Sequence, residues 1–151
     1  MRALLQRVSR AEVRVGGDTI ASIGPGLLIL VGVGRGDDEL VTDGLARRVS
    51  ELRIFADLEG RTNRSIIDMA GAALVVSQFT LYADTSRGRR PGFTDAASPE
   101  LAERLYLRFA DGLRLNGVAD VQTGSFGAEM AIELVNDGPF TIWLDTRKRA
   151  V

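Results

Sequence analysis

The chain has 151 residues and a mass of 16.3 kDa, which suits one domain over residues 1–151 with a possible C-terminal tail at residues 145–151. Its apolar content of 45% is ordinary for a soluble protein, it has no apolar run near the ~18 residues of a membrane span, and its net charge of −1 argues against a globally basic nucleic-acid binder. The chain has no histidine and no cysteine, which excludes a Ser-His-Asp triad, a histidine-bearing metal site and a thiol nucleophile.

The first third of the chain reads as short strands joined by turns. Residues 4–15 nearly alternate between apolar and charged side chains, and the turn at residues 16–18 follows them. Residues 19–23 then form a return strand, residues 24–26 a second turn and residues 27–33 a buried strand. Three strands in succession predict the start of an antiparallel meander.

A helix is expected next. Asp37 and Asp38 can cap it, and apolar residues recur at spacings of three or four at Val41, Leu45, Val49 and Leu52. The glycines of residues 31–36 superficially resemble a phosphate-binding loop, but they lack its Gly-Lys-Ser/Thr ending. We therefore expect a plain turn between strand and helix.

A second helix is predicted near residue 98. Ser98 is a good N-cap, and Pro99 fits the first helical position. Apolar residues then recur at the helical spacing at Leu101, Leu105 and Phe109. The pair Asn116-Gly117 predicts the end of this helix.

The remaining apolar runs predict four more strands, at residues 72–81, 118–123, 128–135 and 140–144. The predicted fold class is therefore α+β, with a mainly antiparallel, barrel-like sheet and two helices packed on it. Residues 83–97 are expected to form an exposed loop of the kind that often carries function.

A polar motif, Ser77-Gln78-Phe79-Thr80, stands at the end of the apolar run 72–76. If the strand continues through it, Ser77 and Phe79 share one face and Gln78 and Thr80 share the other. Two readings stay open from these residues alone. The motif is either part of a site or the polar end of a strand that runs out into solvent.

The segment 136–141 interrupts the last apolar run with Gly138-Pro139. One reading is a β-turn between Val135 and Phe140. The other is a specific cis X-Pro bond, which about 5–6% of such bonds adopt. A cis bond would fix the direction of the neighbouring carbonyl groups and could serve recognition.

Basic residues gather in three places, which could form phosphate-facing patches or simply a solvated surface. The three groups are Arg87, Arg89 and Arg90; Arg147, Lys148 and Arg149; and Arg7, Arg10 and Arg14. Arginines near the N-terminus also interrupt any signal-peptide core, and the lack of cysteine fits a reducing compartment. We therefore expect a cytoplasmic protein.

Four ordered motifs together resemble the D-aminoacyl-tRNA deacylase family. They are residues 75–81, 90–93, 123–128 and 136–139, and the similarity runs from residue 1 to about residue 144, including the openings Gln6-Arg7-Val8 and Gly26-Leu27-Leu28. The chain departs from the family pattern at Gly92, where serine is frequent, and in its tail. The role of that tail is open.

The resemblance implies a homodimeric hydrolase that removes D-amino acids, and glycine mischarged on alanine tRNA, from the 3′ end of tRNA. It implies no cofactor, no metal, no membrane and no DNA partner. Catalytic positions would be Ser77, Gln78, Phe79 and Thr80, the pocket would be lined by Phe126, Gly127, Ala128 and Met130, and tRNA would contact Arg7, Arg87, Arg89 and Arg90. Gly138 and Pro139, joined by a cis bond, would enter the partner subunit's pocket and reject L side chains.

The chemistry of such a site has to work without a conventional base. Thr80 is the obvious nucleophile but needs a base, for which Asp84 or Asp137 could be suggested. The absent histidine favours a different account. In it, backbone N–H groups near Phe79 and Thr80 stabilise the oxyanion, and the terminal ribose 2′-OH assists the attacking water.

Two other functions compatible with these residues are a non-catalytic module that binds the tRNA acceptor end and a small-molecule esterase.

Overall fold

The structure is a computed structural model that describes residues 1–147. Of the basic cluster predicted at residues 147–149, Lys148 and Arg149 therefore lie outside the described residues. Across the described part of the chain, no helix is long and apolar enough to cross a membrane.

A long first strand organises the sheet. β1 (Arg2–Val15) pairs antiparallel with β8 (Ala131–Asp145) over almost its whole length. On its other side its first half pairs with β3 (Gly26–Gly32) and its second half with β2 (Asp18–Ile23), both antiparallel. The predicted meander is wrong in this respect, because β1 is long enough to separate β2 from β3 in the sheet order.

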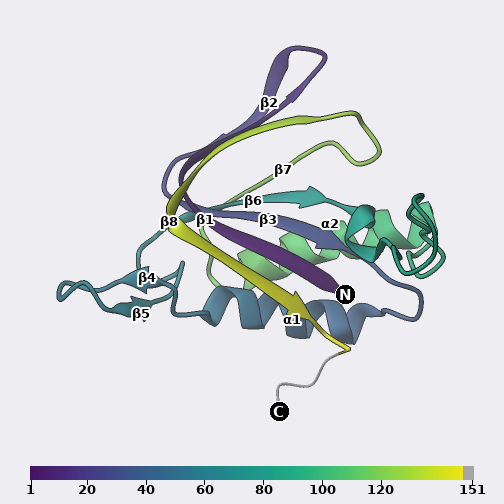
Figure 1. Ribbon diagram of the computed structural model, residues 1–151. Coiled ribbons are helices and arrows are strands. Elements are labelled where there is room, and N and C mark those ends of the chain that lie inside the picture. Colours follow the sequence, from purple (N-terminus) through teal and green to yellow (C-terminus); the bar gives the residue numbers. More distant parts are fainter. Residues whose placement is uncertain (148–151) are drawn as a thin grey trace.

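The other side of the sheet is parallel. β6 (Ala72–Ser77) runs parallel to β3, and β7 (Asp120–Thr123) runs parallel to β6. Two helices make the crossovers that parallel neighbours need, α1 (Glu39–Glu51) after β3 and α2 (Pro99–Leu115) after β6. Both helices lie on the same face of the sheet (Figure 1). The predicted α+β class with two packed helices is confirmed, although the sheet is mixed.

The caps of both helices follow the sequence. The Asp38 side chain accepts a hydrogen bond from the N–H of Val41 at 2.9 Å, and Ser98 accepts one from Leu101 at 3.4 Å. Asp37, predicted as a second cap, is buried and turned to other partners. The turn expected before α1 is present.

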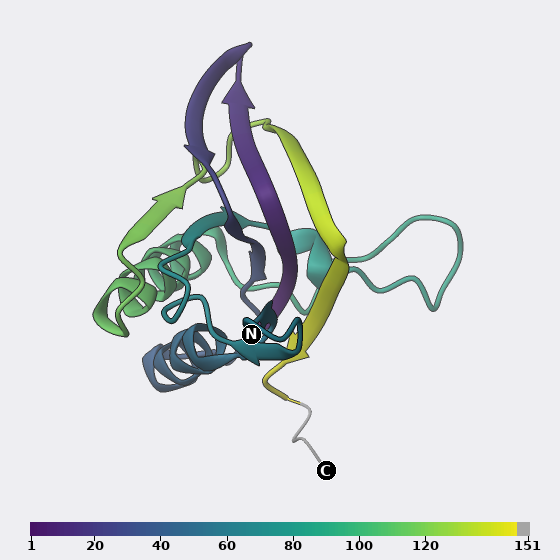
Figure 2. The same cartoon turned by 90° about the vertical axis from the view of Figure 1, so that its left-hand side faces the viewer.

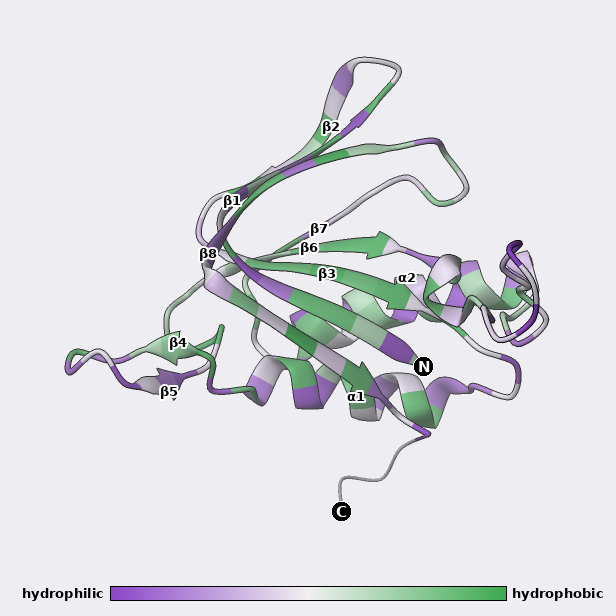
Figure 3. Ribbon diagram, viewed as in Figure 1, coloured by the Kyte–Doolittle hydropathy of each residue, from purple (hydrophilic) through white to green (hydrophobic). Residues whose placement is uncertain are grey.

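The sheet has a core on each face. Its strands β3 and β6 are the most hydrophobic part of the ribbon (Figure 3). One core packs against α1 and α2 through buried residues such as Leu45, Leu105 and Phe109. The second forms where the far half of β1, with β2 and the first half of β8, bends over the opposite face, and it includes Val13 and Leu74. This curvature gives the barrel-like shape.

Two predicted strand boundaries are wrong at the polar motifs. β6 ends at Ser77, and a 3₁₀ helix, η1 (Phe79–Tyr82), follows it. The N–H of Gln78 makes the last ladder bond, to the carbonyl of Val31 at 2.8 Å, and the buried ring of Tyr82 then turns the chain inward. Ser77 and Phe79 therefore do not share a strand face.

The turn expected at Gly138 is absent, because β8 is one strand from residue 131 to residue 145. Its register with β1 shifts twice, between Gln6 and Val8 and between Val8 and Arg10. These irregularities accommodate the Gly138-Pro139 segment without ending the strand. A small hairpin of β4 (Phe55–Ala56) and β5 (Thr62–Arg64) follows the C-terminal end of α1 and projects from the body of the molecule (Figure 1).

The end of β8 is tied to the start of β1. Asp145 is buried and accepts hydrogen bonds from Nε of Arg2 at 3.1 Å and from the N–H of Arg147 at 3.0 Å. Burial acts to raise the pKa of Asp145, but the Arg147 N–H and the Arg2 guanidinium outweigh it and hold this pKa below its usual value.

Candidate active site

A pocket of about 510 Å³ opens where β6 ends. Three segments distant in sequence form its walls: residues 76–79, residues 96–102 at the start of α2, and residues 126–132 leading into β8. The lining side chains are uncharged and mostly apolar. They are Val33, Val76, Ser77, Gln78, Phe79, Ala96, Ala97, Pro99, Ala102, Phe126, Gly127, Ala128, Met130 and Ile132.

Three of the four predicted catalytic residues, Ser77, Gln78 and Phe79, lie on one wall of this pocket. Ser77 and Gln78 are partly buried, and Phe79 is 52% exposed at the mouth. Thr80 stands one position further along η1, exposed and outside the lining. Its hydroxyl contacts the side-chain amide of Gln78. The amide of Gln78 therefore links Thr80 to the pocket wall.

The predicted lining residues Phe126, Gly127, Ala128 and Met130 all lie on the opposite wall. Tyr106 of α2 packs against this wall. Its ring centroid lies 6.1 Å from that of Phe126, and its buried hydroxyl donates to the carbonyl of Val75 at 3.0 Å. The carbonyl of Val75 also accepts the N–H of Gly124 at 3.0 Å. The segment is thus anchored to β6 just before the pocket.

Sequence reasoning missed half of the lining. The missed residues are Val33, Val76, Ala96, Ala97, Pro99, Ala102 and Ile132. They are apolar and mostly small, so nothing in their chemistry distinguishes them from core positions. Pro99 was visible only as the first residue of a helix, and that helix start is what brings it to the pocket.

The loop predicted over residues 83–97 borders the mouth of the pocket. Its base is closed by the bridge between Asp84 and Gly92, and the ring of Phe93 lies 4.9 Å from that of Phe79. The loop projects from the body beside η1 (Figure 2). Its three arginines, Arg87, Arg89 and Arg90, are exposed. A basic loop therefore stands next to the opening of the pocket.

The Gly138-Pro139 bond is cis, as the resemblance implied, and neither residue lines the pocket of its own chain. Both are exposed on β8. Arg7 holds this segment in place. Its guanidinium donates to the carbonyl of Asp137 at 2.9 Å and to that of Ile54 at 2.8 Å, and it lies 4.7 Å from the ring centroid of Phe140. These contacts occupy Arg7 within the chain and do not support its predicted role in tRNA binding.

No charged side chain lines the pocket. Of the two carboxylates suggested as bases, Asp84 accepts hydrogen bonds from Ser86, which lower the pKa of Asp84 and make it a weaker base. Asp137 lies beside Arg7, at 3.8 Å between carboxylate and guanidinium, and does not line the pocket. Among the described residues, no group of three or more metal-ligating side chains gathers.

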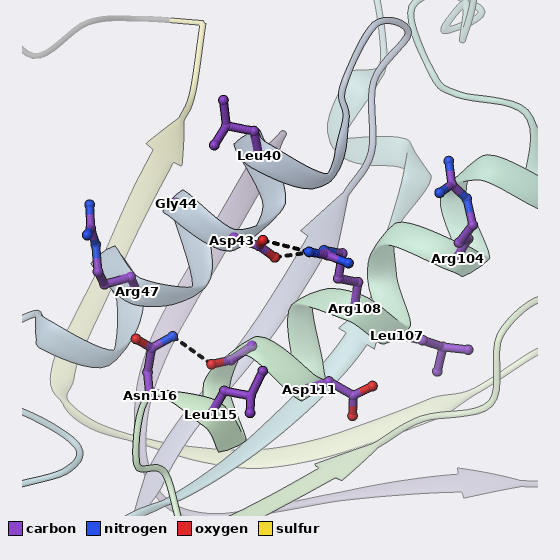
Figure 4. A pocket seen from close by; sticks show the side chains of 11 residues that line it. Leu40, Asp43, Gly44, Arg47, Arg104, Leu107, Arg108, Asp111, Leu115 and Asn116 are labelled. Carbon is purple, nitrogen blue, oxygen red and sulfur yellow. Dashed lines mark hydrogen bonds and ion pairs between the residues drawn. The ribbon is translucent and has the colours of Figure 1, made fainter.

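A larger hollow of about 830 Å³ lies between α1 and α2 on the outer side of the helices (Figure 4). Most of its charged side chains form ion pairs, either with each other or with residues beside the hollow. Arg108 forms a bidentate pair with Asp43 at 2.7 Å, and Arg104 pairs with Glu39. None of the predicted site residues lies there. The pocket at the end of β6 is the better candidate for an active site.

Comparisons with known proteins indicate the family of the chain. The family model described as D-Tyr-tRNA(Tyr) deacylase matches residues 4–145. A D-aminoacyl-tRNA deacylase of Paracoccus denitrificans is 60% identical over 99% of this chain and 100% of its own length. One of Symbiobacterium thermophilum is 57% identical over 98% of this chain and 97% of its own length.

Two solved structures share the fold. A structure titled c-Myc DNA Unwinding Element Binding Protein is 38% identical, covers 96% of this chain and 98% of its own, and superposes with a TM-score of 0.91. A structure titled as a probable eukaryotic D-amino acid tRNA deacylase superposes with a TM-score of 0.80 at 19% identity, over 95% of this chain and 97% of its own. At that identity the second likeness concerns the fold alone.

Proposed function

Because the chain belongs to the D-Tyr-tRNA(Tyr) deacylase family, we propose that it hydrolyses the ester bond between a D-amino acid and the 3′ end of tRNA, releasing both. The observation that carries this function is the uncharged pocket walled by Ser77, Gln78 and Phe79 in a chain 57–60% identical to relatives named D-aminoacyl-tRNA deacylase. Its product is a free D-amino acid and an uncharged tRNA. The enzyme works in the cytoplasm, where charged tRNA is used.

The pocket binds the aminoacyl group, and water attacks its carbonyl carbon. No side chain of the lining can act as a strong base. The first N–H groups of a helix have no partner within that helix, and those of Phe79 and Thr80 stand at the start of η1. They stabilise the negative charge that develops on the carbonyl oxygen, and the 2′-OH of the terminal ribose assists the water.

Replacing Thr80 with alanine tests this mechanism. Because Thr80 stands outside the lining and contacts Gln78, Thr80→Ala should slow turnover through misplacement yet leave measurable activity. A tRNA ending in 2′-deoxyadenosine should be nearly inert with the unaltered enzyme. Full activity on the deoxy substrate would refute the substrate-assisted mechanism, and complete inactivity of a folded Thr80→Ala enzyme would contradict a merely positioning role for Thr80.

Selection for D-amino acids comes from a second copy of the chain. In a homodimer, the carbonyl groups at Gly138 and Pro139 of one subunit enter the other subunit's pocket, hold the α-amino group and leave no room for an L side chain. Two facts support this arrangement: both residues are exposed on β8, and neither lines the pocket of its own chain. Glycine has no side chain to reject, so glycine on alanine tRNA is also a substrate.

The decisive assay measures release from D-Tyr-tRNA beside L-Tyr-tRNA. We expect release from the D form and little from the L form. Equal release of both would refute the chiral filter, and release of neither would favour a module that only binds the acceptor end. Turnover of a simple D-amino acid ester as fast as that of charged tRNA would instead favour a small-molecule esterase.

The loop arginines Arg87, Arg89 and Arg90 contact phosphates of the acceptor stem. Their exposure beside the mouth of the pocket supports this role, and binding should weaken steeply with salt. Replacing all three with glutamine should flatten the salt dependence. The matched control is Arg61→Gln, an exposed arginine on the distant β4–β5 hairpin, which should leave it unchanged. A salt slope that survives in the triple variant would remove the loop from the interface.

A further inference from the structure

A buried carboxylate outside the pocket lining is linked to two edges of the pocket, which we call the Phe79 rim (η1) and the Ala96 rim (residues 96–97). Asp37 precedes α1 and is 7% exposed. Because Asp38 caps the helix, the carboxylate of Asp37 is available to other donors. It accepts hydrogen bonds from the Met1 ammonium at 2.7 Å, the N–H of Gly34 at 2.6 Å and the Tyr82 hydroxyl at 3.3 Å. Three elements of the fold therefore meet at one side chain.

The contact with Tyr82 leads to the Phe79 rim. Tyr82 is the last residue of η1, the element that begins with Phe79 at the mouth of the pocket. The Tyr82 ring packs so closely on Gly34 that a Cβ atom there would lie 2.6 Å from the ring. Arg2 covers the ring at 4.4 Å from its centroid and donates to the carbonyl of Leu81 at 2.8 Å. Asp37 thus fixes the inner end of the segment whose outer end borders the pocket.

The contact with Gly34 leads to the Ala96 rim. Gly34, whose N–H binds Asp37, forms an antiparallel bridge with Ala96. Next to it, the N–H of Ala97 donates to the carbonyl of Val33 at 3.0 Å. Val33, Ala96 and Ala97 all line the pocket. The oxygen that holds Gly34 is also the one that accepts the Tyr82 hydroxyl, so a single carboxylate oxygen connects both rims.

The Tyr82 hydroxyl stays protonated, which preserves its hydrogen bond to Asp37. Burial and the neighbouring Asp37 carboxylate raise the pKa of Tyr82 above its ordinary value, so its hydroxyl keeps its proton and can donate at any assay pH near neutrality. A buried carboxylate that loses a donor is left with an unsatisfied oxygen, which the surrounding structure has to move to satisfy. A change at this position is therefore transmitted to the segments attached to it.

We propose that Asp37 is a positioning residue for the deacylation, which holds the Phe79 rim and the Ala96 rim of the pocket at the spacing the substrate needs. This role rests on the proposed deacylase function. Asp37 does not line the pocket, and it acts through Tyr82 and Gly34. Small displacements of reacting groups are enough to matter, since a shift of about 1 Å can slow a reaction about a hundredfold.

The test compares the loss of a hydroxyl group that donates to Asp37 with the loss of a nearby buried hydroxyl group that does not. Tyr82→Phe removes only the donor to Asp37, and Asp37→Asn keeps the shape but removes the charge. The matched control is Thr42→Val. Thr42 is fully buried and close to Met1, and its hydroxyl donates to the carbonyl of Asp38 at 2.7 Å, while it lines neither rim.

Release of D-tyrosine from tRNA, measured for kcat and KM separately, distinguishes positioning from plain stability. We expect Tyr82→Phe to lower kcat about tenfold while KM changes less than about twofold, because the rims place the reacting groups and do not bind the tRNA body. Asp37→Asn should lower kcat further. Thr42→Val should keep kcat within about twofold even where its melting temperature falls as much as that of Tyr82→Phe.

The possible outcomes distinguish the deacylase function from the role of Asp37. A wild-type enzyme that releases no D-tyrosine would overturn the deacylase function, and this role with it. An active wild type with full turnover in Tyr82→Phe, or with equal losses in Tyr82→Phe and Thr42→Val, would overturn the role of Asp37 alone. If Asp37→Asn does not fold, the comparison of Tyr82→Phe with Thr42→Val still decides.

Discussion

Replacing Arg7 with methionine removes the guanidinium that holds the Gly138-Pro139 segment while keeping most of the side-chain stem. Two hydrogen bonds from a charged donor are lost, one to the carbonyl of Ile54 and one to that of Asp137. Each such bond contributes about 1.5–3 kcal/mol when buried.

The structure sets the size of the effect. Ile54 is buried, so its carbonyl cannot easily replace Arg7 with water, and that bond should contribute about 2 kcal/mol. Asp137 is exposed and its carbonyl can be rehydrated, which reduces that contribution to about 0.5 kcal/mol. Loss of the contact with the Phe140 ring adds about 0.5 kcal/mol. Arg7→Met should therefore lower the free energy of unfolding by about 3 kcal/mol.

Urea unfolding measures this loss, and the ratio of D-Tyr-tRNA to L-Tyr-tRNA release measures its effect on selectivity, which we expect to fall. The matched control is Arg10→Met on the same strand. The side chain of Arg10 is 56% exposed and pairs with Glu133, which is equally exposed, so its loss should change stability by less than about 1 kcal/mol. Equal stability losses in the two variants, or an Arg7→Met enzyme with unaltered selectivity, would refute the reasoning.

Three further changes test the packing around the site. Tyr106→Phe should lower stability by only about 1 kcal/mol, measured by urea unfolding, because the carbonyl of Val75 keeps its second donor; a loss above about 3 kcal/mol would contradict this account. Gly112→Ala should lower the melting temperature, since its Cβ would lie 2.7 Å from that of Ala46, and an unchanged melting temperature would show that α1 and α2 can separate freely. Asp145 has a lowered pKa, so its carboxylate stabilises the fold at neutral pH, and this contribution is lost as the pH falls below about 4. The variant Asp145→Asn should therefore lose less stability than the wild type on acidification, measured by urea unfolding at each pH. An equally steep loss in both proteins would show that Asp145 does not contribute to the acid sensitivity.

The helices were predictable because their signals are local. Ser98 and Pro99 mark the start of α2, and Asp38 marks that of α1, since capping depends on residues within one turn. The end of β6 was not predictable in this way. Phe79 and Thr80 suit a strand, and what bends the chain is the burial of Tyr82 against Gly34, just beyond the end of β3.

The residues of the candidate site fall into the same two groups, those with a recognisable signal in the sequence and those without one. Residues with distinctive chemistry, such as Ser77, Gln78 and the Gly138-Pro139 pair, could be found in the sequence. Ala96 and Ala97 could not, because an alanine carries no chemical signature and reaches the pocket only through its bridge to the end of β3. Of the two readings of Gly138-Pro139, the β-turn is wrong: a glycine-proline pair usually indicates a turn, but pairing with β1 on both sides keeps β8 continuous.

The three separate walls of the pocket also determine when the pocket can form during synthesis. During synthesis, residues 76–79 and 96–102 emerge from the ribosome well before residues 126–132, and the last wall leads directly into β8. β8 in turn pairs with β1, the first strand to be made. The pocket is thus completed only when the two ends of the chain meet, and a chain truncated before residue 126 lacks its third wall.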